Sequence, residues 1–263
     1  MLDLIRRIVY RLYTIGLDGK KLRGKAKNIL LGQQGLLDIY GFESGTDKAS
    51  LLVEGSTILP AHDYLRHYDY FFHSFRDKTF TLVEFGCYRG ESLSTWGGYF
   101  PKAQIVGVDL DEEVKQYEKE RIHIVIGDAT SEDTYKQIEE HCGDKQCPFI
   151  IIDDASHAWG DQRRSLELFW KLLLPGGFYV VEDLQCGTLG AYPWFPPKVR
   201  DSQPFFEYVQ ERCKLLRYPA DAIPSNLKWL EELPVEVKMI ETQLDACFFV
   251  PGAIILRKKT EVG

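Results

Sequence analysis

From residue 79 onward, short apolar runs alternate with stretches whose apolar residues recur at helical spacing. Each apolar run has the length and the β-branched and aromatic content of a buried strand. The expected strands cover 79–86, 103–110, 121–128, 148–154 and 178–184, and the expected helices cover 91–100, 131–143 and 161–174. Strands that alternate with helices are typical of a parallel sheet with helices on its faces, so we expect an α/β fold.

The rest of the chain departs from this alternation in three places. The tail DACFFVPGAIILRKK (245–259) predicts a strand pair that turns near Pro251 and Gly252 and closes the sheet antiparallel, which gives seven strands in all. A Pro- and aromatic-rich insertion at 187–244 is interpreted as a lid over the strand ends. Residues 1–43 are expected to form a helical N-terminal extension, and residues 44–263 the main domain.

Composition narrows the classes of function. A chain of 263 residues that is 44% hydrophobic can bury one sizeable core. Its formal net charge of −7 disfavours a nucleic-acid partner, because phosphates require a basic face. The six cysteines are scattered and no secretory signal precedes them, so we expect a protein of the reducing cytoplasm.

Charge is concentrated at the start of the chain. Residues 1–30 hold eight Lys or Arg and two Asp, a local charge of +6, and the first fifteen residues have apolar positions at helical spacing. One interpretation is a helix that packs on its own domain or on a second copy of the chain. Packing on a second copy would make the protein a homo-oligomer. The other is peripheral contact with the anionic inner face of a membrane.

Polar residues at successive strand ends predict a cofactor site. The loop 84–90 follows the first strand, and Gly86 and Gly90 allow its backbone to turn close to a ligand, although its spacing is not that of NAD-binding loops. Asp109 ends the second strand, where a carboxylate can accept hydrogen bonds from both hydroxyls of a ribose. Asp128 follows the third strand and is placed to reach an adenine edge. Ligands bind at such strand ends in open α/β sheets.

Carboxylates also gather at the ends of the last two parallel strands. Asp153 and Asp154 end one strand, and Glu182 and Asp183 end the next, to which a single helix connects it. Their carboxyl ends should therefore face one crevice. Clustered carboxylates repel one another unless a hard divalent cation with oxygen ligands neutralises them, and Mg²⁺ is the natural occupant. Asp153 either faces the cofactor or holds a loop.

These motifs together resemble the class I S-adenosylmethionine-dependent methyltransferases, which have a Rossmann-like fold. More narrowly, they are similar to the metal-dependent sugar O-methyltransferases that tailor macrolides of the mycinamicin and tylosin type. The resemblance covers residues 44–186 and the final strand pair. It is carried by GTDKAS (45–50), HDYLRHYDYFF (62–72), LVEFGCYRGESLSTW (82–96), IIIDDASH (150–157) and GGFYVVEDL (176–184).

The resemblance assigns roles to individual residues. It implies that Asp154, Glu182 and Asp183 are Mg²⁺ ligands, with Asp154 also counted among the catalytic residues, and that His157 is the general base. His157 could instead cap the following helix. The cofactor-binding residues implied for S-adenosylmethionine are Glu84, Gly86, Tyr88, Gly90, Asp109, Asp128 and Asp153, with Asp47, Lys48 and Tyr64 at family positions that otherwise read as turn and packing residues.

The expected activity is transfer of a methyl group to a sugar hydroxyl of a glycosylated natural product or of a surface-glycan precursor. A sugar hydroxyl is too weak an acid to ionise unaided, and a metal ion together with a histidine meets that need. Two alternatives remain open. A catechol or another vicinal diol would also chelate Mg²⁺, and a methyltransferase-like fold can serve as a scaffold without catalysis.

Overall fold

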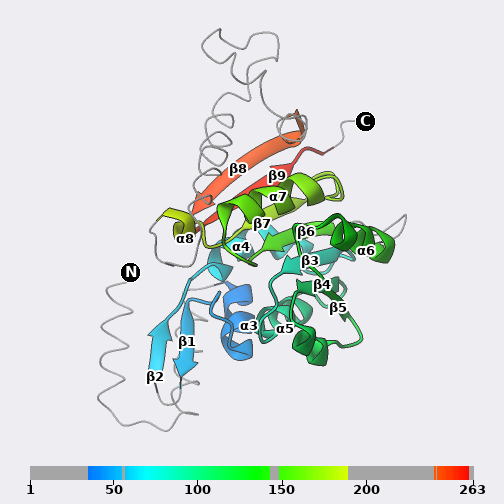
Figure 1. Ribbon diagram of the computed structural model, residues 1–263. Helices are drawn as coiled ribbons and strands as arrows, with labels where there is room; N and C mark the ends of the chain where they lie inside the picture. The colour runs from blue at the N-terminus through cyan, green and yellow to red at the C-terminus, as the bar shows by residue number, and fades with distance from the viewer. Residues whose placement is uncertain (1–34, 55–56, 143–147, 189–239, 241, 261–263) are drawn as a thin grey trace. The chain divides into compact units, whose positions relative to one another are not determined.

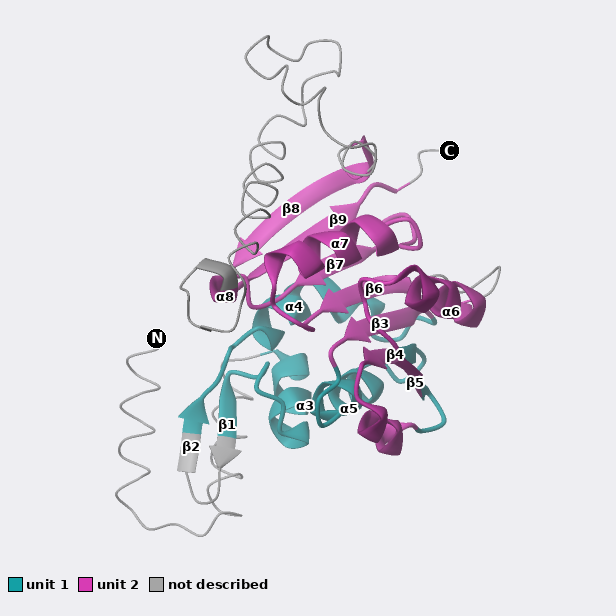
Figure 2. Cartoon of the chain, in the orientation of Figure 1, with its two compact units in different colours: residues 1–79, 87–105, 119–122 teal, residues 80–86, 106–118, 123–263 magenta. Residues whose placement is uncertain are grey.

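The computed structural model of the chain describes residues 35–54, 57–142, 148–188, 240 and 242–260. The predicted basic helix within residues 1–30 and most of the predicted lid lie outside these ranges. The chain divides into two compact units, coloured teal and magenta in Figure 2. Unit 1 comprises residues 1–79, 87–105 and 119–122, and unit 2 comprises residues 80–86, 106–118 and 123–263. The domain boundary at residue 44 stays a prediction.

A seven-stranded sheet forms the framework (Figure 1). Its order is β5-β4-β3-β6-β7-β9-β8, in which β6 pairs in parallel with β3 and β7, while β9 pairs antiparallel with β7 and β8. The predicted mixed sheet with an antiparallel C-terminal pair is therefore confirmed. The strands are β3 (Thr81–Phe85), β4 (Gln104–Asp109), β5 (Ile122–Ile126), β6 (Pro148–Asp153), β7 (Phe178–Val181), β8 (Leu244–Val250) and β9 (Ala253–Lys258).

The connecting helices fall where the apolar periodicity predicted them. They are α5 (Glu91–Tyr99), α6 (Glu132–Cys142) and α7 (Trp159–Phe169), joined by the short elements η2 (Glu112–Tyr117) and α8 (Gln185–Thr188). Helix α7 begins two residues before its predicted start, since Ala158 still has extended backbone and Trp159 is the first helical residue. The first residue of β8, Leu244, lies inside the span predicted for the lid.

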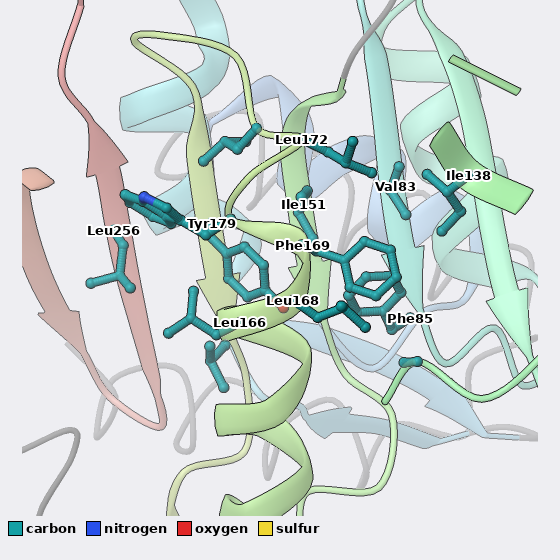
Figure 3. Packing of buried hydrophobic residues seen from close by; sticks show 14 of the residues in the cluster. Val83, Phe85, Ile138, Ile151, Leu166, Leu168, Phe169, Leu172, Tyr179 and Leu256 are labelled. Atoms are coloured by element: carbon teal, nitrogen blue, oxygen red, sulfur yellow. The ribbon is translucent and has the colours of Figure 1, made fainter. Parts of the chain in front are cut away.

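Helix α7 packs on the sheet through the core of unit 2 (Figure 3). Phe169 of α7 and Phe85 of β3 have ring centroids 4.7 Å apart. Ile151 and Tyr179, from the neighbouring strands β6 and β7, are fully buried in the same cluster. The burial follows from the sequence, because β6 and β7 are continuous apolar runs, as expected for strands covered on both faces.

The described part of unit 1 contains helical segments and a hairpin. The elements are α3 (Leu36–Ser44), β1 (Leu51–Glu54), β2 (Thr57–Pro60), α4 (Leu65–Phe72) and η1 (His73–Phe75), together with α5. The antiparallel pair of β1 and β2 was not anticipated in the sequence. Buried Asp38 of α3 accepts hydrogen bonds from the Ser50 backbone N–H at 2.7 Å and from its hydroxyl at 2.6 Å. Burial raises the pKa of Asp38 above its ordinary value.

Candidate active site

The site lies where the sheet changes winding direction. The chain passes from β3 outward to β4 and β5, then returns to place β6 on the other side of β3, and ligands bind at such a switch point. The turns after β3 and β6 approach closely here, with the Asp154 N–H donating to the Phe85 carbonyl at 3.0 Å. Gly86 has φ +86°, and a Cβ there would lie 2.8 Å from the carbonyl carbon of Asp154. Glycine is therefore required both for the backbone conformation and for the close packing.

A cavity of about 300 Å³ opens beside this turn. Four of the predicted cofactor residues line it: Gly86, Asp109, Asp128 and Asp153. They come from the ends of four strands that are neighbours in the sheet order, as expected for a ligand bound across strand ends. The Asp128 Oδ1 accepts hydrogen bonds from the N–H and the hydroxyl of Thr130, both at 2.8 Å, which fixes this carboxylate at the cavity wall.

Other predicted cofactor residues do not line this cavity. Glu84 is fully buried within β3, and Tyr88 is 75% exposed. Gly90, with φ +71°, precedes the first turn of α5. The conformations at Gly86, Tyr88 and Gly90 all have positive φ, so the loop makes a succession of tight turns, as its two glycines suggested.

The remaining three predicted cofactor residues belong to unit 1. Lys48 and Tyr64 are buried and Asp47 is exposed. Their segments run alongside one another, since the Tyr64 N–H donates to the Lys48 carbonyl at 2.9 Å. Their part in cofactor binding stays a prediction.

A group of metal-ligating side chains stands at the ends of β6 and β7. One ligand atom each from Asp154, His157 and Asp183 lies within 4.8 Å of the others. The imidazole lies between the two carboxylates, with Nδ1 3.7 Å from the Asp154 Oδ1 and Nε2 3.7 Å from the Asp183 Oδ2. The Nδ1 atom is buried and has no hydrogen-bond partner among the described residues. The prediction that these strand ends bring their carboxylates together is therefore confirmed for Asp154 and Asp183.

Two of these three residues have unusual backbone conformations. His157 has φ +57° and Asp183 has φ +56°, in the left-handed region that residues other than glycine rarely adopt. Such conformations persist only where surrounding contacts hold them, and they concentrate at functional sites. His157 precedes the N-cap residue Ala158, and α7 shows no side-chain cap hydrogen bond, so the alternative of a helix-capping histidine is not supported.

Glu182 lies beside this group in sequence but differs in environment. It is fully buried, and its N–H donates to the Asp153 carbonyl at 2.9 Å. The three residues with ligand atoms within 4.8 Å of one another do not include it. Its assignment as a metal ligand stays a prediction.

A buried polar network lies under the turn that follows β6. Asp153 is 2% exposed and accepts hydrogen bonds from the Ser165 hydroxyl and, at 3.5 Å, from the Ala155 N–H. The Tyr179 hydroxyl donates to the Ser165 hydroxyl at 3.3 Å. Burial raises the pKa of Asp153 to about 7. Asp153 therefore lines the cavity and also holds the turn after β6, while its contact with the cofactor stays a prediction.

Sequence reasoning missed several cavity residues. Ser156, Asp161 and Ser165 also line the cavity, and the Ser156 hydroxyl donates to the Asp161 Oδ2 at 2.7 Å. All three lie within fifteen residues of β6, either in its following turn or in α7. The usable signal was their position after a strand end, where small polar residues can face a ligand.

The donor set suits a hard divalent cation. Asp154 and Asp183 offer carboxylate oxygens, the ligands that Mg²⁺ prefers, whereas a neutral imidazole suits softer transition metals. This preference leaves His157 available for proton transfer. The residues present therefore fit the predicted assignment of Mg²⁺ to the carboxylates and of the base to His157.

Sequence comparison finds related O-methyltransferases of natural products. The 8-demethyl-8-alpha-L-rhamnosyl tetracenomycin-C 2'-O-methyltransferase of Streptomyces olivaceus is 30% identical over 179 residues, which are 65% of this chain and 46% of that protein. The mycinamicin VI 2''-O-methyltransferase of Micromonospora griseorubida is 31% identical over 131 residues, 47% of this chain and 32% of that protein. The chain thus spans less than half the length of these relatives. No protein-family model matches the chain.

Solved structures identify the fold. The mycinamicin-pathway methyltransferase MycE, in complex with Mg and S-adenosylhomocysteine, superposes with a TM-score of 0.65 at 21% identity over 87% of this chain and 54% of that one. Its complex with Mg, S-adenosylhomocysteine and mycinamycin VI superposes with a TM-score of 0.63 at 18% identity over 95% of this chain and 66% of that one. The strand order and these superpositions show that the chain has the fold of the class I S-adenosylmethionine-dependent methyltransferases, and its sequence is similar to those of O-methyltransferases named for mycinamicin VI and for a rhamnosyl tetracenomycin.

Proposed function

We propose that the protein transfers the methyl group of S-adenosylmethionine to a sugar hydroxyl, with Mg²⁺ at Asp154 and Asp183. The observation that carries the proposal is the group of Asp154, His157 and Asp183 next to a cavity that holds Gly86, Asp109, Asp128 and Asp153. Methyl transfer requires the acceptor oxygen to lie in line with the methyl group of the donor. The two binding sites adjoin one another, because Asp153 lines the cavity and the next residue, Asp154, belongs to the metal-ligating group. The names of the related enzymes support the same reaction.

In this proposal the cavity binds the methyl donor. Asp109, the last residue of β4, accepts hydrogen bonds from the ribose hydroxyls, and Asp128 lies at the adenine. Gly86 allows the chain to pass close to the amino-acid part of the cofactor. Charge-assisted hydrogen bonds of the ribose type are among the stronger ones in proteins, so Asp109 should contribute more to affinity than the apolar lining.

His157 removes the proton from the acceptor. Bound Mg²⁺ would neutralise the carboxylates and lower the pKa of a coordinated hydroxyl. The imidazole of His157 takes the hydroxyl proton, the acceptor oxygen forms a bond to the methyl carbon, and the carbon–sulfur bond breaks with its electrons going to sulfur. The products are a methyl ether, S-adenosylhomocysteine and a protonated His157, whose imidazole lies between Asp154 and Asp183. General-base help of this kind contributes roughly 10²–10⁴-fold to a rate.

The proposed acceptor is a sugar already attached to a larger molecule. The relatives are named for a rhamnosyl tetracenomycin and for mycinamicin VI, both of which are natural products. An oxygen-rich metal site with positions left open is matched by two adjacent hydroxyls of a sugar ring. A surface-glycan precursor on a lipid carrier has the same chemistry, and the basic residues 1–30 would bring the enzyme to the anionic membrane where such a precursor lies. Self-association through this segment also stays a prediction.

A competition assay tests the proposal. Mycinamicin VI, a nucleotide-linked sugar and a catechol are offered together with S-adenosylmethionine and Mg²⁺, and the methylated products are separated by mass spectrometry. We expect the glycoside to be methylated first. Preference for the catechol would mean that the acceptor is an aromatic diol and not a sugar. Preference for the nucleotide sugar would contradict an acceptor carried on a membrane lipid. Binding of S-adenosylhomocysteine without transfer to any of the three would favour a scaffold.

A further inference from the structure

Two side chains of α7 hold the segment that carries Asp183. The Gln162 Nε2 donates to the Glu182 carbonyl at 2.7 Å, and the Trp159 Nε1 donates to the Leu184 carbonyl at 2.9 Å. The two accepting carbonyls therefore belong to the residues on either side of Asp183. Gln162 is 1% exposed and its hydrogen bond is buried, whereas Trp159 is 5% exposed and its hydrogen bond is partly buried. Buried hydrogen bonds of this kind fix geometry, because the carbonyl has no solvent alternative.

The held segment needs such support. Asp183 has φ +56°, a conformation that costs energy for a residue with a side chain. Backbone hydrogen bonds also tie its neighbours, with the Leu184 N–H donating to the Gly252 carbonyl at 2.9 Å and the Cys186 N–H to the Asp183 carbonyl at 3.0 Å. The conformation places the Asp183 carboxylate 3.7 Å from the His157 Nε2. If the segment relaxed to negative φ, this carboxylate would point elsewhere.

The first turn of α7 also lies next to His157, the residue of the metal-ligating group that precedes this helix. Helix α7 begins at Trp159, two residues after His157, so the residue that holds the Leu184 carbonyl is covalently close to the imidazole. The first turns of α7 thus connect the turn that carries Asp154 and His157 to the turn that carries Asp183. Without this connection, the pairing of β6 and β7 and the backbone hydrogen bonds of the Asp183 turn would have to set the distance between the two turns.

We propose that Trp159 and Gln162 are positioning residues for the metal site, holding the Asp183 carboxylate in register with Asp154 and His157. The inference rests on the Mg²⁺ site of the proposed function and adds the residues that set its geometry. Side chains that orient the ligands of a metal ion commonly change its affinity 10- to 100-fold when they are removed. Neither side chain needs to touch the metal or the substrate.

A matched control exists on the same helix. Trp170 follows the last residue of α7, is fully buried, and donates its Nε1 hydrogen to the Gln243 Oε1 at 3.1 Å. Trp159→Phe and Trp170→Phe each remove one indole N–H donor and the same side-chain volume. The two substitutions lie at opposite ends of α7. Gln162→Met gives a second, independent variant, because it keeps the side-chain length and removes a buried Oε1 that has no hydrogen-bond partner among the described residues.

The test measures metal binding directly. Mn²⁺ affinity is measured by electron paramagnetic resonance and S-adenosylhomocysteine affinity by calorimetry for the full chain and the three variants. We expect Trp159→Phe and Gln162→Met to weaken Mn²⁺ binding about 10-fold or more, with S-adenosylhomocysteine affinity changed less than about 3-fold. Trp170→Phe should lower the urea midpoint while Mn²⁺ affinity stays within about 2-fold of wild type.

The outcomes separate this inference from the proposed function. If the wild-type chain fails to bind Mn²⁺, the metal site itself is wrong and the positioning role falls with it. If wild type binds Mn²⁺ and both Trp159→Phe and Gln162→Met bind it equally well, the positioning role is overturned and the metal site stands. Equal weakening in all three variants would also overturn it, since the effect would then be a general loss of stability. Should Trp159→Phe not fold, Gln162→Met alone decides between these results.

Discussion

Replacement of Gly86 by alanine should damage both the fold and the site. Gly86 has φ +86°, and the left-handed region costs about 1–2 kcal/mol for a residue with a Cβ. The new Cβ would also lie 2.8 Å from the carbonyl carbon of Asp154 and 3.0 Å from the Cα of Ala155, and closer still to the Asp154 carbonyl oxygen. These neighbours are backbone atoms, so relief requires movement of the turn itself. Overpacking that shifts backbone costs about 1–3 kcal/mol, which gives a total of about 2–5 kcal/mol.

Two other glycines separate the two contributions. Gly45 has φ +89°, and a Cβ added there would meet no heavy atom within 4 Å beyond its chain neighbours, so Gly45→Ala isolates the conformational cost. A Cβ added at Gly177 would lie 2.6 Å from the Phe149 carbonyl oxygen, and the φ of Gly177 lies outside the left-handed region. Gly177→Ala therefore isolates the cost of steric overlap with the backbone. Urea unfolding gives the free energy of each variant, and calorimetry gives its affinity for S-adenosylhomocysteine.

We expect Gly45→Ala to lose about 1 kcal/mol and to bind S-adenosylhomocysteine as wild type does. Gly86→Ala should lose at least about 1 kcal/mol more and bind S-adenosylhomocysteine at least about 10-fold more weakly, because the displaced turn carries Asp154 and borders the cavity. The close approach of the β3 and β6 turns would be refuted if Gly86→Ala matched Gly45→Ala in stability and wild type in affinity.

Three further predictions concern single side chains. Asp109→Ala should weaken S-adenosylhomocysteine binding in calorimetry by about 1–3 kcal/mol, and unchanged affinity would remove the ribose assignment. His157→Ala should slow methyl transfer roughly 10²–10⁴-fold while Mn²⁺ and cofactor still bind, with the loss shrinking as pH rises and hydroxide replaces the imidazole; a wild-type rate would make His157 structural. Burial raises the folded-state pKa of Asp38, so the folded chain binds more protons and should lose stability as pH rises from about 4 through that pKa. Asp38→Asn should remove this loss in urea unfolding at a series of pH values, and identical pH profiles would contradict it.

Most of the sheet could be predicted because buried strands carry their own signal. The run IIIDD, for example, combines β-branched apolar residues with a polar end, and β6 ends at Asp153 within it. The hairpin of β1 and β2 was missed because each strand has only four residues, too few for a clear alternation. The motif resemblance indicated the polar strand ends, and the topology then brought Asp154 and Asp183 together.

The finer geometry of the site had no such signal. Positive φ at His157 and Asp183 is imposed by tertiary contacts, and neither residue type announces it in a sequence. The roles of Trp159 and Gln162 depend on which backbone carbonyls after β7 lie within reach of α7, and the sequence does not show this. Their three-residue spacing indicates only that both lie on one buried helix face.

The described part of the chain contains no helix long and apolar enough to cross a membrane.

Methyl transfer under controlled metal supply tests the central claim most directly. Tritiated S-adenosylmethionine and mycinamicin VI are incubated with the full chain in Mg²⁺, in EDTA, and in EDTA followed by excess Mg²⁺, with Asp183→Asn measured in parallel. The account predicts transfer in Mg²⁺, its loss in EDTA, its return with added Mg²⁺, and no transfer by Asp183→Asn although that variant still binds S-adenosylhomocysteine. Full transfer in EDTA, or wild-type transfer by Asp183→Asn, would contradict it.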